Sequence, residues 1–458
     1  MALGFGAGNS GREGYRIKVS GSFTMGEDEK LLAVRSGRIQ FSHHPMSHLP
    51  QVLLTAAVWG VLLPFLAAVI STGTVFWLFS LPLRRLPRDA HWSEAARLYW
   101  HLRIARIMGT IWIVIAACAA SYGDLSASGD VWMLVPVALS AVAGCVTGYR
   151  EAGRGLVLPD TLRSGNLRST FAQFILFPAL PAMLAIMAFT WRRGLGWESF
   201  AFTAGVLLVL VALCVGGSVA ILRVAGLLQP VDEALQKSSR ELASAQGVPL
   251  RHVMRLDLPM ANAFAFPWTK DLGFTRATLD ILDAEELASV IGHELGHLKE
   301  GLATRWTRLI GLLAVSTVSL APAAIHDGRP LLAAGFFAAY VLISRFGARF
   351  HKRLEVSADQ EAHLSEAAEG VYARALEKIH ATSLIPAVLH PRSPYPSLYD
   401  RMTSSGITPD FPRSAPPGRL LPLLCGVAAT ALYFFLWQGL GHAASDLMDS
   451  PPAWESRR

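Results

Sequence analysis

The segment Asp283–Gly301, DAEELASVIGHELGHLKEG, decides how this sequence is interpreted. Asp283 is a favourable N-cap residue, and Glu286, three residues later, completes a capping-box pattern. Between the two ends, apolar residues recur at helical spacing: Leu287, Val290, Ile291, Leu295 and Leu298. The pattern predicts a single helix that ends near Gly301.

The two histidines of this segment, His293 and His297, are four residues apart and therefore face the same side of the predicted helix. Two imidazoles placed in this way can bind one zinc ion through their neutral nitrogens. Glu294 follows the first histidine, where its carboxylate can reach a water on the metal and act as general base. The alternative is a helix with two solvated histidines, which its charged flanks would allow: Glu285, Glu286, Lys299 and Glu300.

A catalytic zinc site requires a third protein ligand and leaves one position open for water. The candidate is Glu355 in the segment Lys352–Asp359, KRLEVSAD, which is predicted to be helical. Asp359 lies one turn later on the same face, where it could accept the free ring N–H of His293 or His297. The alternative is an ordinary solvated helix face. The histidine helix on the same predicted side of a membrane favours a site for one Zn²⁺ per chain.

Composition separates this chain from soluble proteins. Of its 458 residues, 52% are hydrophobic and only 16% are charged. Soluble domains usually have about 25% charged residues, and apolar runs of about 20 residues, such as those found here, are long enough to cross a bilayer. The net charge of +7 is assigned to cytoplasmic loops, and no basic patch with interleaved aromatic residues indicates a nucleic-acid partner. The composition therefore predicts an integral membrane protein whose main partner is the lipid bilayer.

About eight segments are long and uncharged enough to be spans. They are Val52–Leu83, Ile104–Ser121, Val131–Gly148, Phe171–Trp191, Phe200–Leu222, Leu309–Ile325, Leu331–Ser344 and Leu420–Leu440. Leu331–Ser344 is short enough to be a buried helix instead. The fold class expected from these segments is an all-α dominated, multi-span helical bundle that carries a soluble unit.

The spans and the polar stretches between them predict how the chain is organised. The expected parts are a disordered N-terminal tail, 1–50; a five-span membrane region, 51–228; a first enzymatic part with the zinc helix, 229–303; a membrane hairpin, 304–347; a second enzymatic part with the third ligand, 348–417; a last span, 418–441; and a C-terminal tail, 442–458. Within the N-terminal tail, Met25 and Met46 are alternative starts.

The basic loops predict the orientation, because cytoplasmic loops carry an excess of Lys and Arg. The loop Arg84–Arg106 holds six arginines, whereas the next loop, Tyr122–Asp130, has two aspartates and no basic residue. Parity then places both soluble stretches, 227–305 and 345–419, in the cytoplasm. The pair Arg192–Arg193 falls outside and opposes this assignment.

Four blocks of the sequence, in this order, resemble the M48 peptidase family of membrane metalloproteases, which includes the HtpX heat-shock proteases and the CAAX prenyl proteases. The blocks are Asn262–Ala265, NAFA; His293–His297, HELGH; Glu355–Asp359, with Ala before the Asp; and His390-Pro391 followed by Arg401-Met402. Two features depart from the family pattern. Val356 stands where an aromatic residue is usual, and Arg392–Leu398 lengthens the fourth block.

The resemblance implies a gluzincin-type metalloprotease unit and a role for each matching position. His293, His297 and Glu355 would bind zinc, and Glu294 would be the base. His390 or Arg401 would contact the substrate or stabilise the oxyanion, although His390 could be a loop residue and Arg401 a surface charge.

The first block implies a place for the substrate. Asn262, Ala263 and Phe264 would lead into an edge strand that pairs with the substrate peptide by strand addition. The alternative is that Asn262 is a turn residue and that Ala263 and Phe264 belong to the core.

Together these features predict a zinc-dependent endopeptidase that hydrolyses peptide bonds of membrane-associated proteins, in a multi-pass protein of a bacterial plasma membrane with its site facing the cytoplasm. An intramembrane site-2-type protease is disfavoured, because charged residues flank the motif too closely for the zinc helix to be a span. A sensor-transducer metalloprotease of the antibiotic-sensing receptor type and an inactive membrane scaffold remain as alternatives.

Overall fold

A computed structural model of the chain describes residues 32–35, 38–41, 61–125, 134–156, 159, 172–173, 175–258 and 260–449. Within the predicted N-terminal tail, it describes two antiparallel strands, β1 (Leu32–Arg35) and β2 (Arg38–Phe41). The expected disorder of the rest of 1–50 lies outside the described residues, as do residues 450–458 of the predicted C-terminal tail.

The chain forms two compact units. The first comprises Met1–Pro82, His101–Leu156 and Arg419–Arg458. Its helices are α2 (Leu63–Phe79), α5 (Leu134–Gly153), α19 (Leu420–Asp449) and the larger part of α4 (Trp92–Leu125), and α2 packs against both α5 and α19. The short helix α3 (Leu81–Arg84) follows α2 at the border of this unit.

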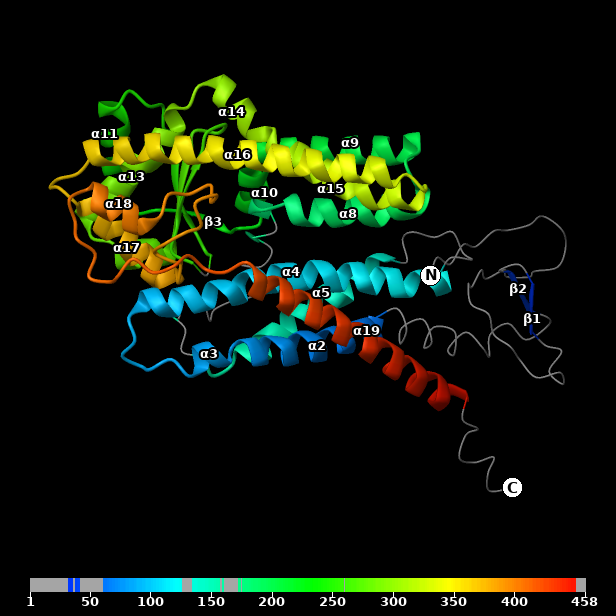
Figure 1. The fold of residues 1–458 in the computed structure, drawn as a ribbon. Helices are drawn as coiled ribbons and strands as arrows, with labels where there is room; N and C mark the ends of the chain where they lie inside the picture. Colours follow the sequence, from blue (N-terminus) through cyan, green and yellow to red (C-terminus); the bar gives the residue numbers. More distant parts are fainter. Residues whose placement is uncertain are drawn as a thin grey trace. The chain divides into compact units, whose positions relative to one another are not determined.

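The second unit contains both candidate enzymatic segments and a bundle of apolar helices. The bundle consists of α8 (Ala179–Arg193), α9 (Trp197–Ala212), α15 (Gly311–His326) and the first half of α16 (Pro330–Leu364) (Figure 1). A π-helical turn, Leu213–Gly217, joins α9 to α10 (Ser218–Val224). Asp327, in the turn between α15 and α16, accepts a hydrogen bond of 2.7 Å from the backbone N–H of Leu195, so the two hairpins are tied together at their turns.

A four-stranded sheet forms the rigid centre of the candidate enzymatic part. Its strands lie in the order β3 (Leu228–Pro230), β4 (His252–Leu256), β6 (Asp271–Thr275) and β5 (Ala263–Phe266). Only β4 and β6 are parallel, and β5 is an edge strand. The sequence interpretation expected a mostly helical unit with one edge strand, and the other three strands were not anticipated.

Three helices pack against this sheet, α11 (Glu233–Ala245), α12 (Arg276–Ile281) and α13 (Ala284–Lys299). The same unit also contains α14 (Leu302–Leu309), α17 (Val371–Ser383) and α18 (Leu398–Ser404). The main core lies between sheet and helices and includes the fully buried Leu272, Phe274 and Leu295. The predicted helix is confirmed as α13: Asp283 and Glu286 form the capping box, and Glu300 is the C-cap.

Five helices of the described residues are long and apolar enough to cross a membrane: Trp92–Cys118, Trp197–Val224, Leu302–His326, Pro330–Leu364 and Leu420–Leu440. Each overlaps one predicted span. The other three predicted segments overlap α2, α5 and α8, which are not among the five. The segment that could have been a buried helix lies in α16 and exposes large apolar side chains, including Leu331 and Leu342. These helices suggest an integral membrane protein.

Candidate metal centre

The centre depends on the close packing of α13 against α16. Two glycines on α13, Gly292 and Gly296, face the second half of α16. A Cβ atom at Gly296 would lie 3.0 Å from the Cα of Ala358, and one at Gly292 would collide with Ser365. Only glycine at these positions lets the two backbones approach this closely, and the approach brings Glu355 over the histidines.

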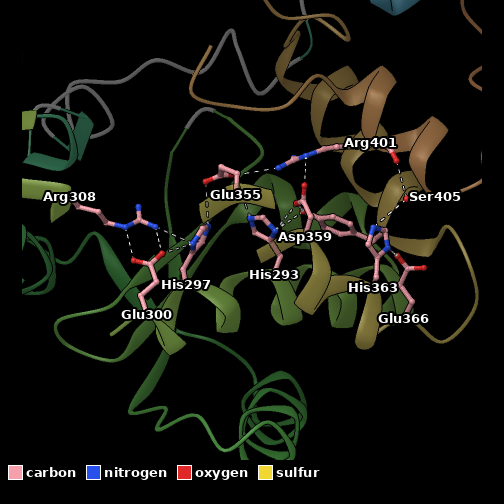
Figure 2. A network of polar contacts seen from close by, with 11 residues as sticks. His293, His297, Glu300, Arg308, Glu355, Asp359, His363, Glu366, Arg401 and Ser405 are labelled. Carbon is pink, nitrogen blue, oxygen red and sulfur yellow. Dashed lines mark hydrogen bonds and ion pairs between the residues drawn. The ribbon is translucent and has the colours of Figure 1, made fainter. Parts of the chain in front are cut away.

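The three predicted ligands meet at one point (Figure 2). The Nε2 atoms of His293 and His297 lie 3.7 and 3.4 Å from the two carboxylate oxygens of Glu355. All three side chains are nearly buried, at 10–12% exposed. Ligand atoms at tetrahedral zinc are about 3.3–3.6 Å apart when each lies 2.0–2.2 Å from the metal. The two nitrogens and the carboxylate therefore form a donor set of the kind that catalytic zinc uses, and the two nitrogen–oxygen separations are close to this spacing.

Each histidine is also held through its other ring nitrogen. The Nδ1 of His293 lies 3.1 Å from Asp359 Oδ1 and 2.7 Å from the hydroxyl of Tyr372. The Nδ1 of His297 lies 3.0 Å from Glu300 Oε1. Because both Nδ1 atoms have carboxylate partners, the Nε2 atoms are the ring nitrogens that face Glu355 and would ligate a metal. Asp359 was predicted to serve either histidine, and the structure places it with His293.

Arg401 belongs to the same network, although it comes from α18. Its Nε lies 2.8 Å from Asp359 Oδ2 and its Nη2 lies 3.4 Å from Glu355 Oε2. The side chain is only 13% exposed, so Arg401 is not a surface charge. The hydroxyl of Tyr372 donates to Asp359 at 2.8 Å, which leaves the Asp359 carboxylate between one cation and two hydrogen-bond partners.

The proposed base, Glu294, is buried on α13 between the two histidines. Burial raises the pKa of its carboxyl above the ordinary value, and the nearby rings of His293 and His297 oppose the shift. The backbone of Ala265 in β5 also interacts with this carboxylate. Burial lowers the pKa of His297, but hydrogen bonds to Glu300 and Glu355 outweigh burial and raise it to about 10.

The first sequence block lies at the start of the edge strand, as expected. Asn262 precedes β5, and its backbone N–H donates to Thr275 Oγ1 at 3.0 Å. Ala263 belongs to the main core, and Phe264 packs on a second apolar cluster. Both side chains thus have packing roles, while the strand itself is positioned beside Glu294. Pairing with a substrate stays a prediction.

His390 lies in the loop between α17 and α18, where its Nδ1 accepts a hydrogen bond of 3.2 Å from the backbone N–H of Arg392. This contact is local to the loop. The structure therefore brings five of the predicted residues into one network: His293, His297, Glu355, Asp359 and Arg401. The role predicted for His390 stays a prediction.

Sequence reasoning missed the residues that contact the two ligand histidines from outside the predicted set: Tyr372, Glu300 and Arg308. Glu300 follows His297 by three residues, which is one helical turn, so its spacing carried a usable signal. Tyr372 and Arg308 carried none, because their places depend on how α17 and α14 pack.

Comparison with known proteins supports a metallopeptidase. Residues 230–447 match the model of peptidase family M48. The chain is 45% identical over 62 residues to a "Protease HtpX homolog" of Methanothermobacter thermautotrophicus, which covers 13% of this chain and 24% of the relative. It is 46% identical over 61 residues to "Protease HtpX homolog 1" of Sulfurisphaera tokodaii, covering 13% and 20%.

A third relative, a "Protease HtpX homolog" of Dictyoglomus thermophilum, is 33% identical over 109 residues, or 22% of this chain and 36% of the relative. The chain thus spans only 20% to 36% of the length of these curated relatives. The search of solved structures gave no match. The matched family region contains the His293–Glu355 network, and this region of the chain is similar to peptidase family M48 and to HtpX proteases.

Proposed function

We propose that this chain is a membrane zinc endopeptidase that binds one Zn²⁺ through His293, His297 and Glu355. One observation carries the proposal: the three ligand groups converge in a nearly buried site, and both histidines are held at Nδ1 by carboxylates. Two imidazoles and one carboxylate with room for a further ligand are a donor set typical of catalytic rather than structural zinc.

The reaction proposed is hydrolysis of a peptide bond. Zinc, when bound, supplies a Lewis acid that polarises a carbonyl and acidifies water. Glu294 accepts a proton from the attacking water and then returns it to the amine of the departing product. Its buried position beside two histidines suits this work, because burial raises its pKa toward neutrality while the rings limit the shift. Arg401 and His390 are proposed contacts for the substrate or the oxyanion.

The edge strand β5 is the proposed binding site of the substrate peptide. One side of β5 pairs with β6, and the other side is not paired with a described strand. An extended peptide added there would form backbone hydrogen bonds next to Asn262, Ala263 and Phe264. Since the Ala265 backbone contacts the carboxylate of Glu294, such a peptide would run past the base.

Membrane proteins and their cytosolic segments are the proposed substrates. The same helix, α16, carries exposed apolar residues such as Leu331 and Phe337 in its first half and Glu355 in its second half. The metal centre therefore follows a candidate span on one continuous helix, which suits cleavage at a bilayer surface. We propose that this surface is the cytoplasmic face of a bacterial plasma membrane, because the basic loops predict that orientation.

The test uses the whole chain purified in detergent, with zinc content and cleavage of labelled casein as the two measurements. Glu294→Gln is expected to keep one zinc per chain and to lose cleavage by about 10²–10⁴-fold, the usual contribution of a general base. Glu285→Gln, an exposed carboxylate of the same helix, is the matched control and should behave like wild type. Glu355→Ala should lose zinc. Equal cleavage by Glu294→Gln and wild type would overturn the mechanism.

A further inference from the structure

Glu300 is a buried carboxylate that the proposed reaction does not use. It is the C-cap residue of α13, three residues after His297, and its side chain is only 6% exposed. A carboxylate in such a place is costly unless it is paired and hydrogen-bonded. Its partners should therefore show what it does.

Arg308 on α14 contacts both oxygens of this carboxylate (Figure 2). Its Nε lies 2.7 Å from Oε2, and its Nη2 contacts Oε1. The two contacts form the fork geometry that fixes a carboxylate in one orientation. The Glu300 carboxylate cannot rotate while this clamp holds.

One of the two carboxylate oxygens that Arg308 contacts, Oε1, also reaches the metal ligand His297. Oε1 of Glu300 lies 3.0 Å from Nδ1 of His297, and Arg308 Nη2 lies 3.2 Å from the same nitrogen. An ordinary ion pair between Glu300 and Arg308 would not need the contact between Glu300 Oε1 and His297 Nδ1. Its geometry is that of a carboxylate that orients a ligating imidazole, and the corresponding partners of His293 are Asp359 and Tyr372.

Further cations stabilise the C-terminal end of α13, which helps to hold Glu300 next to His297. Lys270 donates to the backbone oxygen of Leu298 at 2.6 Å, and Arg305 donates to that of Glu300 at 3.0 Å. Cations at the C-terminal end of a helix stabilise its free carbonyl groups. Arg305 and Arg308 both come from α14, the first turns of the candidate span Leu302–His326.

We propose that Glu300, clamped by Arg308, is a positioning residue for the metal ligand His297. Glu300 accepts the Nδ1–H of His297, which fixes the tautomer and turns Nε2 toward Glu355 and His293. The two ligand histidines are thus oriented by different parts of the fold: His293 by α16 and α17, and His297 by the segment that leads into the apolar hairpin. This inference rests on the proposed function of the same site as a zinc centre.

The test measures metal binding rather than cleavage. Metal-free protein in detergent is titrated with Zn²⁺ in competition with a chromophoric chelator, and Co²⁺ is used to record the visible absorption spectrum of the site. Loss of a carboxylate that orients a ligand histidine lowers metal affinity about 10–100-fold. Glu300→Ala should show this loss and a changed Co²⁺ spectrum. Glu300→Gln keeps the shape and one acceptor oxygen, and should weaken Zn²⁺ binding by several-fold.

The matched control is Glu361→Gln, which removes the neighbouring ion pair with Lys299 without touching a ligand. It should leave both affinity and spectrum unchanged. If Glu300→Ala fails to fold, Glu300→Gln decides. Zn²⁺ affinity and a Co²⁺ spectrum equal to wild type in the folded Glu300 variants would overturn the inference while leaving the zinc centre intact. A wild-type protein that binds no Zn²⁺ would instead overturn the proposed function.

Discussion

Replacing Gly296 by valine should damage the metal centre more than it damages the fold. A Cβ at this position lies 3.0 Å from Ala358 Cα and 3.3 Å from Ala358 Cβ. Non-bonded carbon atoms prefer a separation of about 3.5–4.0 Å, so α16 has to move away from α13 by roughly 0.5 Å or more. The obstacle is backbone, which cannot rotate away as a flexible side chain could.

This displacement of α16 sets the expected losses of stability and of Zn²⁺ affinity. Overpacking a close interface costs about 1–3 kcal/mol, and the better helix propensity of valine than of glycine returns about 0.4 kcal/mol. A metal site tolerates deviations of only about 0.2 Å in its ligand distances, and Glu355 is one turn from Ala358. We therefore expect a net loss of about 0.6–2.6 kcal/mol in unfolding free energy and a loss of at least about tenfold in Zn²⁺ affinity.

Chelator competition gives the affinity, and denaturant unfolding in detergent gives the stability. The matched control is Gly301→Ala, because a Cβ at Gly301 meets no atom within 4 Å. The control should keep wild-type zinc affinity. A Gly296→Val variant with wild-type affinity would show that the close approach of α13 and α16 does not position Glu355, and the packing argument would be wrong.

Three further outcomes follow from the same structure. Tyr372→Phe removes the hydroxyl group that contacts Asp359 and His293. It should weaken Zn²⁺ binding up to about tenfold in the chelator assay, with little change in cleavage per bound zinc. Burial, aided by the charge of Arg401, lowers the pKa of His380 to about 3, so only the unfolded chain takes up this proton between about pH 6.5 and 3. The free energy of unfolding should therefore decrease as the pH is lowered through this window, by up to about 1.4 kcal/mol per pH unit. The decrease should be less steep in His380→Leu, as unfolding midpoints measured across the pH range will show. Removing zinc with a chelator should abolish cleavage and lower the unfolding midpoint, and added Zn²⁺ should restore both, as calorimetry and casein cleavage will test.

Local patterns predicted the helices of the site well. The capping box at Asp283 and Glu286 and the four-residue spacings of the ligands depend only on helix geometry, and the structure confirms the helices that carry them. That His297 and Glu355 meet was expected from their shared predicted side of the membrane and from the family resemblance, because helix geometry alone does not bring together residues far apart in the sequence.

Features that depend on tertiary packing could not be found in this way. The strands β3, β4 and β6 are three to five residues long, and short apolar runs are ambiguous between strand and helix. Tyr372 has no periodic partner in the sequence, and it enters the site only because α17 packs against α13. Arg401 was open to interpretation as a surface charge for the same reason, since its burial depends on the position of α18.

The order of the ligands along the chain has a consequence for assembly of the site. His293 and His297 precede the apolar hairpin, whereas Glu355 lies on the helix that completes it, α16. The third ligand can reach the histidines only when α15 and α16 have formed and turned back together. Because the proposed zinc site needs all three groups for tight binding, we expect the metal to be loaded only after the hairpin has folded. The Arg308 clamp adds a second link of the same kind, because it joins His297, through Glu300, to the first turns of that hairpin. A chain whose hairpin is not folded would then lack both the metal and the activity, which would restrict proteolysis to protein that has its apolar helices in place.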